Sequence, residues 1–149
     1  MHVSFALFAD AANISQEGKL NILGVFDALQ IGALPAVHPR AAMVVRLKAD
    51  EGDQGMHTLA FGWIGPNGAE IWSSSGEIEV GTPPPGSFEL DIPVIAAIDL
   101  PIQEAGPLTL YADGGAIDTR YPALARAAAS IWVRPNRSWN VAWDVPGGC

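Results

Sequence analysis

The segment 3–31 constrains the fold more than any other part of the sequence, because it reads as two long apolar strands joined by a polar turn. Apolar side chains occupy alternate positions of its first strand: Val3, Phe5, Leu7 and Ala9. A period of two is the pattern of a β-strand. The opposite face carries Phe8 and is not cleanly polar, so we expect this strand to be covered on both sides. The turn falls on Ser15–Gly18, where Gly18 can adopt a positive φ.

The second strand of this segment changes phase near its middle. Leu20 and Ile22 share one face, whereas the apolar positions after them, Leu23, Val25, Leu29 and Ile31, fall on the other. Glycine inside a strand often marks a bulge, which would reconcile the two halves. We therefore predict a β-bulge near Gly24.

This region contains three distinctive stretches: Phe5-Ala-Leu-Phe-Ala-Asp-Ala-Ala-Asn13, Gly18-Lys-Leu-Asn-Ile-Leu-Gly-Val-Phe-Asp27 and Pro35-Ala-Val-His-Pro39. Together they resemble a bacterial family known only as a domain of unknown function. The resemblance is strong over residues 3–48 and weaker up to about Arg126. It implies a small all-β domain with no known activity, and it brings no catalytic residues to this chain.

The rest of the chain alternates short apolar strands with turns. Gly65-Pro-Asn-Gly68 is a hairpin turn, because proline presets φ and Asn-Gly accepts left-handed values. Pro93 interrupts the clearest alternating run and cannot donate to a ladder, so that strand should lie at a sheet edge or be bulged. The run 123–129 could form one or two helical turns. We expect an all-β antiparallel β-sandwich of immunoglobulin or C2-like type, with a closed barrel as the alternative.

Net charge, apolar runs and cysteine content indicate which partners and which cellular compartment to expect. The net charge of −8 disfavours nucleic acid, since an acidic surface repels phosphate. The N-terminus lacks the basic region of a signal peptide, and no apolar stretch is long enough to cross a bilayer, so we expect no membrane association. One cysteine, Cys149, cannot form an internal disulfide, which favours a reducing, cytoplasmic location.

The last thirty residues differ in charge from the rest. Residues 1–119 carry four basic and fifteen acidic side chains, whereas residues 120–149 carry four arginines and one aspartate. We predict a sandwich domain over 1–126 and a C-terminal β-hairpin or arm over 127–149, packed on the domain or on a neighbouring subunit. Trp and Arg are enriched in interface hot spots, so the expected partner or oligomer interface comprises Trp132, Arg134, Arg137, Trp139 and Trp143.

No motif in the sequence indicates catalysis, a metal site or a cofactor. The three histidines are not paired at metal-ligand spacing, and no serine lies in a nucleophile-elbow pattern. Asp10 and Asp27 each end an apolar strand segment and could form a carboxylate pair that shares a proton or binds a cation. The alternative is that they cap strand ends or bond nearby backbone amides. Cys149 follows Pro-Gly-Gly and should be an exposed, reactive thiol.

These observations favour a non-enzymatic binding or interaction module whose partner is a protein or a second copy of the chain. The alternative is a structural component of a larger particle, such as a phage decoration or tail protein, which rests on fold-level analogy. An enzyme of unknown type is the third possibility.

Overall fold

The computed structural model describes residues 1–113 and 127–135, and these form two β-sheets. The four-stranded sheet has the order β2-β1-β4-β7, comprising Leu20–Phe26, His2–Ile14, Ala36–Ala49 and Leu90–Ile102. The five-stranded sheet has the order β3-β9-β8-β5-β6, comprising Ala28–Ile31, Ala127–Pro135, Gly106–Asp113, Gly55–Ile64 and Glu70–Val80. A short 3-10 turn, Glu51–Asp53, links β4 to β5.

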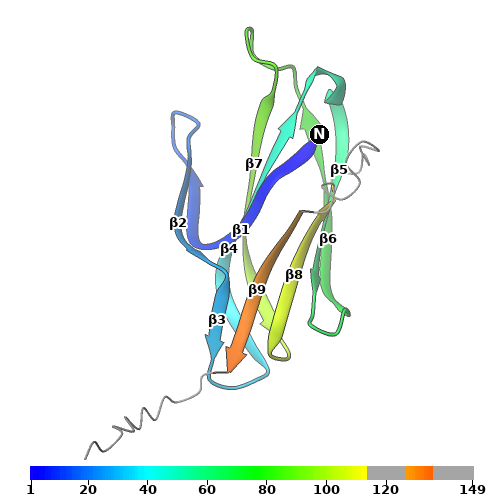
Figure 1. The fold of residues 1–149 in the computed structure, drawn as a ribbon. Coiled ribbons are helices and arrows are strands. Elements are labelled where there is room, and N and C mark those ends of the chain that lie inside the picture. The colour runs from blue at the N-terminus through cyan, green and yellow to red at the C-terminus, as the bar shows by residue number, and fades with distance from the viewer. Residues whose placement is uncertain (114–126, 136–149) are drawn as a thin grey trace, which may run out of the picture.

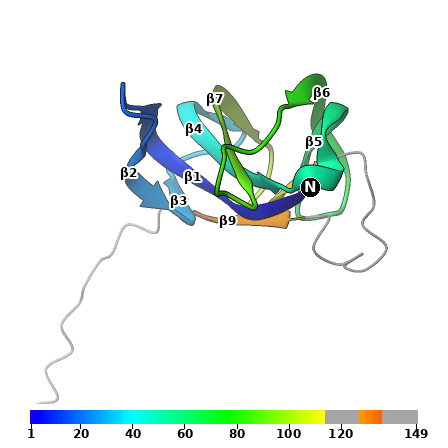
Figure 2. The same cartoon turned by 90° about the horizontal axis from the view of Figure 1, so that it is seen from above.

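The two sheets face each other as a β-sandwich, which confirms the predicted all-β fold (Figures 1 and 2). Neighbouring strands are antiparallel except for β3 and β9, which run parallel. The chain crosses from one sheet to the other at Asp27, between β2 and β3. This crossing attaches the end of the first hairpin to both layers of the sandwich.

The core lies between the sheets and follows from the alternation of the strands. Inward-facing apolar residues of both layers are almost fully buried, including Phe8, Val45, Leu47, Trp63, Leu100, Leu108, Leu110 and Ile131. Burial of apolar surface at about 25 cal/mol per Å² is the main stabilising contribution in such a domain. No buried polar or charged residue lies among the described residues, so burial of hydrophobic side chains holds the two layers together.

β7 lies at the edge of the four-stranded sheet, as Pro93 predicted. Asp91 of β7 and Glu89, which directly precedes β7, form ion pairs with β4: Arg46 Nη2 lies 2.5 Å from Asp91 Oδ2, and Lys48 Nζ lies 2.8 Å from Glu89 Oε2. The Arg46 guanidinium holds the pKa of the Asp91 carboxyl below its usual value. Charged side chains on an edge strand oppose further strand pairing, so this edge of the sandwich is protected.

β9 is an internal strand of the five-stranded sheet. It pairs with β8 on one side and with β3 on the other, and the Trp132 amide donates to the Asp27 carbonyl at 2.8 Å. The first nine residues of the predicted arm therefore belong to the sandwich, and the boundary after residue 126 does not separate β9 from it. The helical alternative for 123–129 is wrong for residues 127–129, which are in this strand.

Candidate functional site: the edge of β2

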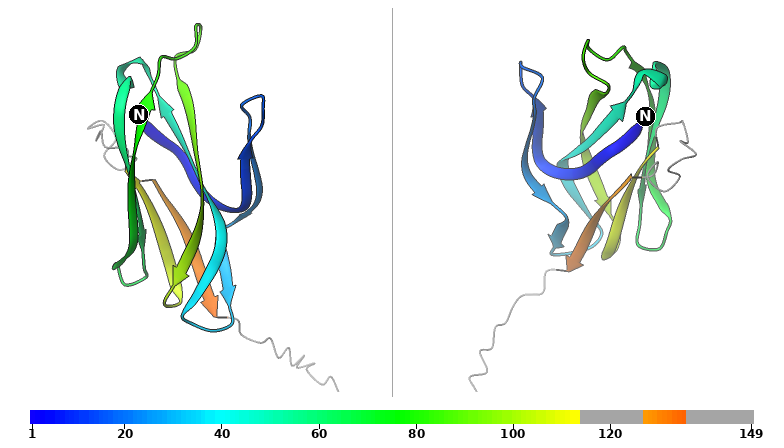
Figure 3. Two further views of the ribbon diagram at one scale, coloured as in Figure 1. Left: turned by 180° about the vertical axis from the view of Figure 1, so that it is seen from behind. Right: turned by 45° about the horizontal axis from the view of Figure 1, so that its top comes forward.

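The first hairpin projects from the sandwich. β1 pairs with β4 only from His2 to Ala9, and it pairs with β2 from Phe8 to Ile14. The second half of β1 and most of β2 therefore extend past β4, which Figure 3 shows from two sides. Within the described residues, this hairpin presents two faces and a long free edge outside the body of the sandwich.

The turn that closes the hairpin fixes its register. The Gly18 amide donates to the Ser15 carbonyl at 2.9 Å, and the Ser15 amide donates to the Lys19 carbonyl at 2.8 Å. Gly18 has a φ of 79°, the left-handed value predicted for it. Ser15 and Lys19 are therefore a hydrogen-bonded pair. The alternation of an antiparallel ladder then directs the amides of Asn21, Leu23 and Val25 toward β1.

Gly24 does not form the bulge that the sequence predicted. Ala9 lies opposite Val25 and Ala11 opposite Leu23, so the register is unbroken on both sides of Gly24. The strand departs from extended geometry instead in the backbone of Gly24 itself, whose φ is 70°. The Asp10 side chain lies directly over it, because a Cβ at Gly24 would overlap Oδ2 of Asp10 and lie 2.8 Å from its Cγ. Glycine is therefore required here by both conformation and space.

Aromatic contacts anchor the base of the hairpin in the core. Phe8 stacks on Phe26 with ring centroids 6.3 Å apart and meets the edge of Trp63 at 5.4 Å. Phe26 in turn contacts the ring of His38 at 5.2 Å. Aromatic pairs of this kind contribute about 0.5–1.5 kcal/mol beyond their area burial. These contacts consequently attach the root of the hairpin to the core.

The free edge belongs to β2, which is the outermost strand of its sheet. From Leu20 to Phe26 it carries no charged residue and no proline, although Leu23 is 71 % exposed and Val25 is 61 % exposed. Natural edge strands are normally protected by charge, proline or a bulge. Because the odd-numbered amides face β1, those of Leu20, Ile22 and Phe26 point outward. Among the described residues, no strand lies beyond them.

The predicted carboxylate pair is not brought together. The hairpin register places Asp10 opposite Gly24, three positions from Asp27 along β2. At about 3.3 Å per residue this is an offset of roughly 10 Å, and an odd number of positions also puts the two side chains on opposite faces. Asp10 covers Gly24, whereas Asp27 contributes its carbonyl to β9. Within the described residues, no group of three or more histidine, cysteine or acidic side chains could hold a metal ion.

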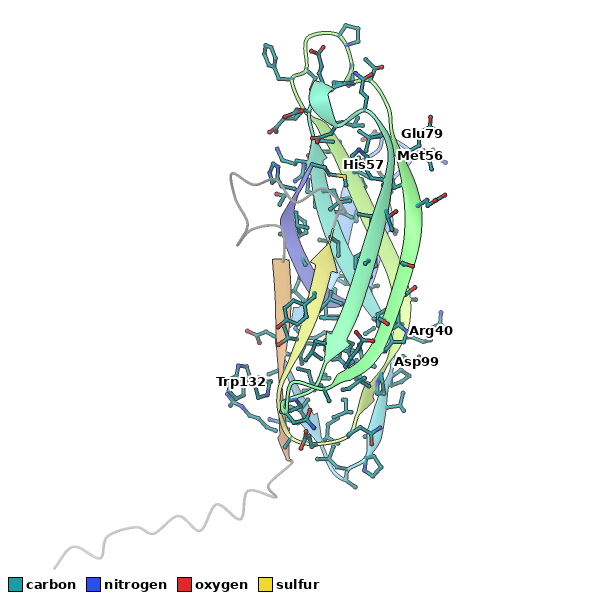
Figure 4. All side chains as sticks on the ribbon, turned by 90° about the vertical axis from the view of Figure 1, so that its right-hand side faces the viewer. Arg40, Met56, His57, Glu79, Asp99 and Trp132 are labelled. Atoms are coloured by element: carbon teal, nitrogen blue, oxygen red, sulfur yellow. The ribbon has the colours of Figure 1, made fainter. Side chains whose placement is uncertain are left out.

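The predicted interface of tryptophans and arginines is described only in part. Trp132 is 53 % exposed, and both it and Arg134 alternate with the buried Ile131 and Val133, so they lie on the outer face of β9. Figure 4 shows Trp132 pointing away from the sandwich. The other predicted residues lie outside the described residues: Arg137, Trp139, Trp143 and Cys149.

Two hollows lie elsewhere on the described part of the molecule. One, of about 150 Å³, is lined by Trp63, Trp72, Ile98, Asp99, Leu100 and Pro101 where the edges of the two sheets meet. Asp99 there accepts a hydrogen bond at 2.8 Å from the amide of Arg40, which has a φ of 51° (Figure 4). The carboxylate thus holds a strained backbone position. The other hollow, of about 430 Å³, is an open space between the loops at 50–52 and 86–88.

Comparison with known proteins identifies a family but no activity. Residues 4–119 match a family of unknown function, DUF6941, and the chain belongs to this family. No curated protein and no solved structure matches the chain. The family region includes the whole projecting hairpin and ends before β9. Among the described residues, no helix is long and apolar enough to cross a membrane.

The edge of β2 was missed by the sequence reasoning, although a signal for it exists. Lys19 and Asp27 flank seven consecutive residues without charge, Leu20–Phe26. Such a run is compatible with a buried central strand as well as with an edge strand. Strand order distinguishes the two cases, and strand order depends on long-range pairing.

Proposed function

We propose that the protein is a non-enzymatic interaction module that binds another polypeptide along the edge of β2 by strand addition. The observation that supports this is the unprotected edge Leu20–Phe26, with outward amides and exposed Leu23 and Val25, on a hairpin that projects from the sandwich. In strand addition, main-chain hydrogen bonds supply affinity and alternate side chains supply specificity. The opposite edge of the same sheet carries charged side chains, so β2 is the edge of this sheet at which a strand can be added.

A photo-reactive amino acid at position 23, introduced in cells that make the protein, tests this function. The expected result is a covalent adduct with a protein chain, because a strand added to β2 lies about 5 Å away. The matched control is position 56, since Met56 is similarly exposed at 62 % but lies in β5, away from the hairpin. Absence of any protein adduct at position 23, with the variant protein folded, would contradict the proposed function.

A further inference from the structure

We propose that the chain added to β2 is the β2 of a second copy, paired antiparallel about a two-fold axis through Leu23. This inference rests on the proposed function, because it names the occupant of the same edge. The pairing would join two four-stranded sheets into one continuous sheet across the two copies. Figures 1 and 2 show that the outer side of β2 is open to such an approach within the described part of the chain.

Backbone geometry restricts the register of this pairing. Outward amides and carbonyls belong to Leu20, Ile22 and Phe26, so these even-numbered residues must face even-numbered residues of the second copy. A two-fold axis through Leu23 satisfies this requirement, with Ile22 opposite Gly24 and Leu20 opposite Phe26 of the second copy. It also uses the full seven-residue length of β2, whereas any shifted register would leave part of the strand unpaired.

Charge favours the same register independently. Lys19 and Asp27 lie four positions before and four positions after Leu23. An axis through Leu23 therefore places Lys19 opposite Asp27 of the second copy, and it does so twice. Within the described residues the Lys19 ammonium forms one ion pair, with Glu17 at 2.8 Å, and both side chains are more than 70 % exposed, so this pair contributes little and Lys19 can exchange it for another carboxylate. Shifting the axis by one residue removes both intermolecular pairs.

Side-chain contacts agree with this arrangement. Leu23 and Val25, the most exposed aliphatic residues of β2, share a face with Asn21. In the proposed register Leu23 meets its own counterpart across a non-hydrogen-bonded position, where side chains approach most closely. Val25 lies opposite Asn21 of the second copy on the same face. The pairing thus covers the apolar surface that the monomer leaves exposed.

The free part of β1 is a poorer site for a second copy. Beyond Ala9 it offers only five residues, from Asp10 to Ile14, and Asp10 carries a charge. A two-fold axis through the middle of that segment would place Asp10 opposite Ile14 of the second copy, with no compensating charge. The β2 edge is longer than the free part of β1, carries no charge, and is flanked by charges of opposite sign. It therefore matches a second copy of itself about a two-fold axis better than β1 does.

Charge reversal, followed by sedimentation equilibrium of the purified full chain, tests the proposal. The wild type should be a concentration-dependent dimer with twice the chain mass of 15.7 kDa. Lys19→Asp and Asp27→Lys should each raise the dimer dissociation constant roughly tenfold, because each places two like-charge pairs at the interface. The double variant Lys19→Asp/Asp27→Lys restores opposite charges and should return the constant to within about threefold of wild type.

A matched variant separates local pairing from overall charge. Asp27→Lys and Glu51→Lys both reduce the net charge from −8 to −6, since each replaces one negative with one positive side chain. Reduced overall repulsion predicts tighter association of both variants, so weaker association of Asp27→Lys alone supports the proposed contact. A wild type that stays monomeric up to about 1 mM would overturn the proposal. A double variant as weak as the single variants would also overturn it.

These outcomes are distinct from failure of the proposed function. An adduct from position 23 with a mass of two chains supports both the function and the self-pairing. An adduct with a different protein, together with a monomeric wild type, overturns the self-pairing and leaves strand addition at β2 standing. No adduct at position 23 overturns both.

Discussion

Replacing Phe8 with alanine should lower the free energy of unfolding by roughly 3–5 kcal/mol. The side chain is 1 % exposed, stacks on Phe26 and contacts the edge of Trp63, so its removal leaves a cavity where the hairpin joins the core. Neighbouring rings cannot fill that space without losing their own contacts. Chemical denaturation followed by tryptophan fluorescence measures the change.

Phe88→Ala is the control for this prediction. Phe88 is 90 % exposed, beside the open hollow between two loops, so its removal should change stability by less than about 0.5 kcal/mol. Similar losses for the two substitutions would show that Phe8 does not lie in the core and would contradict the described register of β1.

Gly24→Ala should lower the free energy of unfolding by roughly 2–4 kcal/mol, more than the same change at Gly18. Both glycines have positive φ, so alanine is strained at either position. A Cβ at Gly18 meets nothing within 4 Å, whereas at Gly24 it would overlap the Asp10 carboxylate. The expected difference between the two variants is about 1 kcal/mol or more, measured by urea denaturation.

Asp10→Ala provides the cross-check for the Gly24 prediction. In the double variant Asp10→Ala/Gly24→Ala, the carboxylate is gone and the cost should fall to roughly that of Gly18→Ala. If the double variant is as unstable as the sum of the two single changes, the side chain of Asp10 does not lie over Gly24. The explanation for glycine at this position would then be its φ alone.

The sequence was sufficient to predict features that depend on local chemistry. Alternating apolar residues predicted the strands, and Ser15–Gly18 predicted the turn with its left-handed glycine. Pro93 predicted an edge strand or a bulge, and β7 lies at the edge. Each of these follows from the conformational limits of a few adjacent residues. The β-sandwich itself follows from many such strands with one apolar face.

Features that depend on pairing between distant segments could not be predicted. The closing pair of the turn, Ser15 and Lys19, puts Asp10 opposite Gly24, so the supposed carboxylate pair with Asp27 does not form. The parallel pairing of β3 with β9 joins residues about a hundred positions apart. Neither arrangement leaves a local signature, because sequence periodicity does not specify which strands become neighbours.

The same reason explains why the sequence analysis placed its candidate interface after residue 126 and did not single out the edge of β2. The density of tryptophan and arginine drew attention to residues after 126, whereas the unprotected edge lies in a segment whose composition resembles an ordinary buried strand. An uncharged strand becomes conspicuous only when strand order shows that it is outermost. Once the strand is known to be outermost, its flanking charges, Lys19 and Asp27, become candidate contacts for a strand added to this edge.

Hydrogen exchange of the β2 amides, followed by NMR at increasing protein concentration, tests the central claim most directly. Inward amides of Asn21, Leu23 and Val25 should be protected at all concentrations, because β1 binds them. We predict that the outward amides of Leu20, Ile22 and Phe26 exchange rapidly when dilute and become protected as the second copy adds to the edge. Outward amides that exchange at unprotected rates at every concentration would contradict the account.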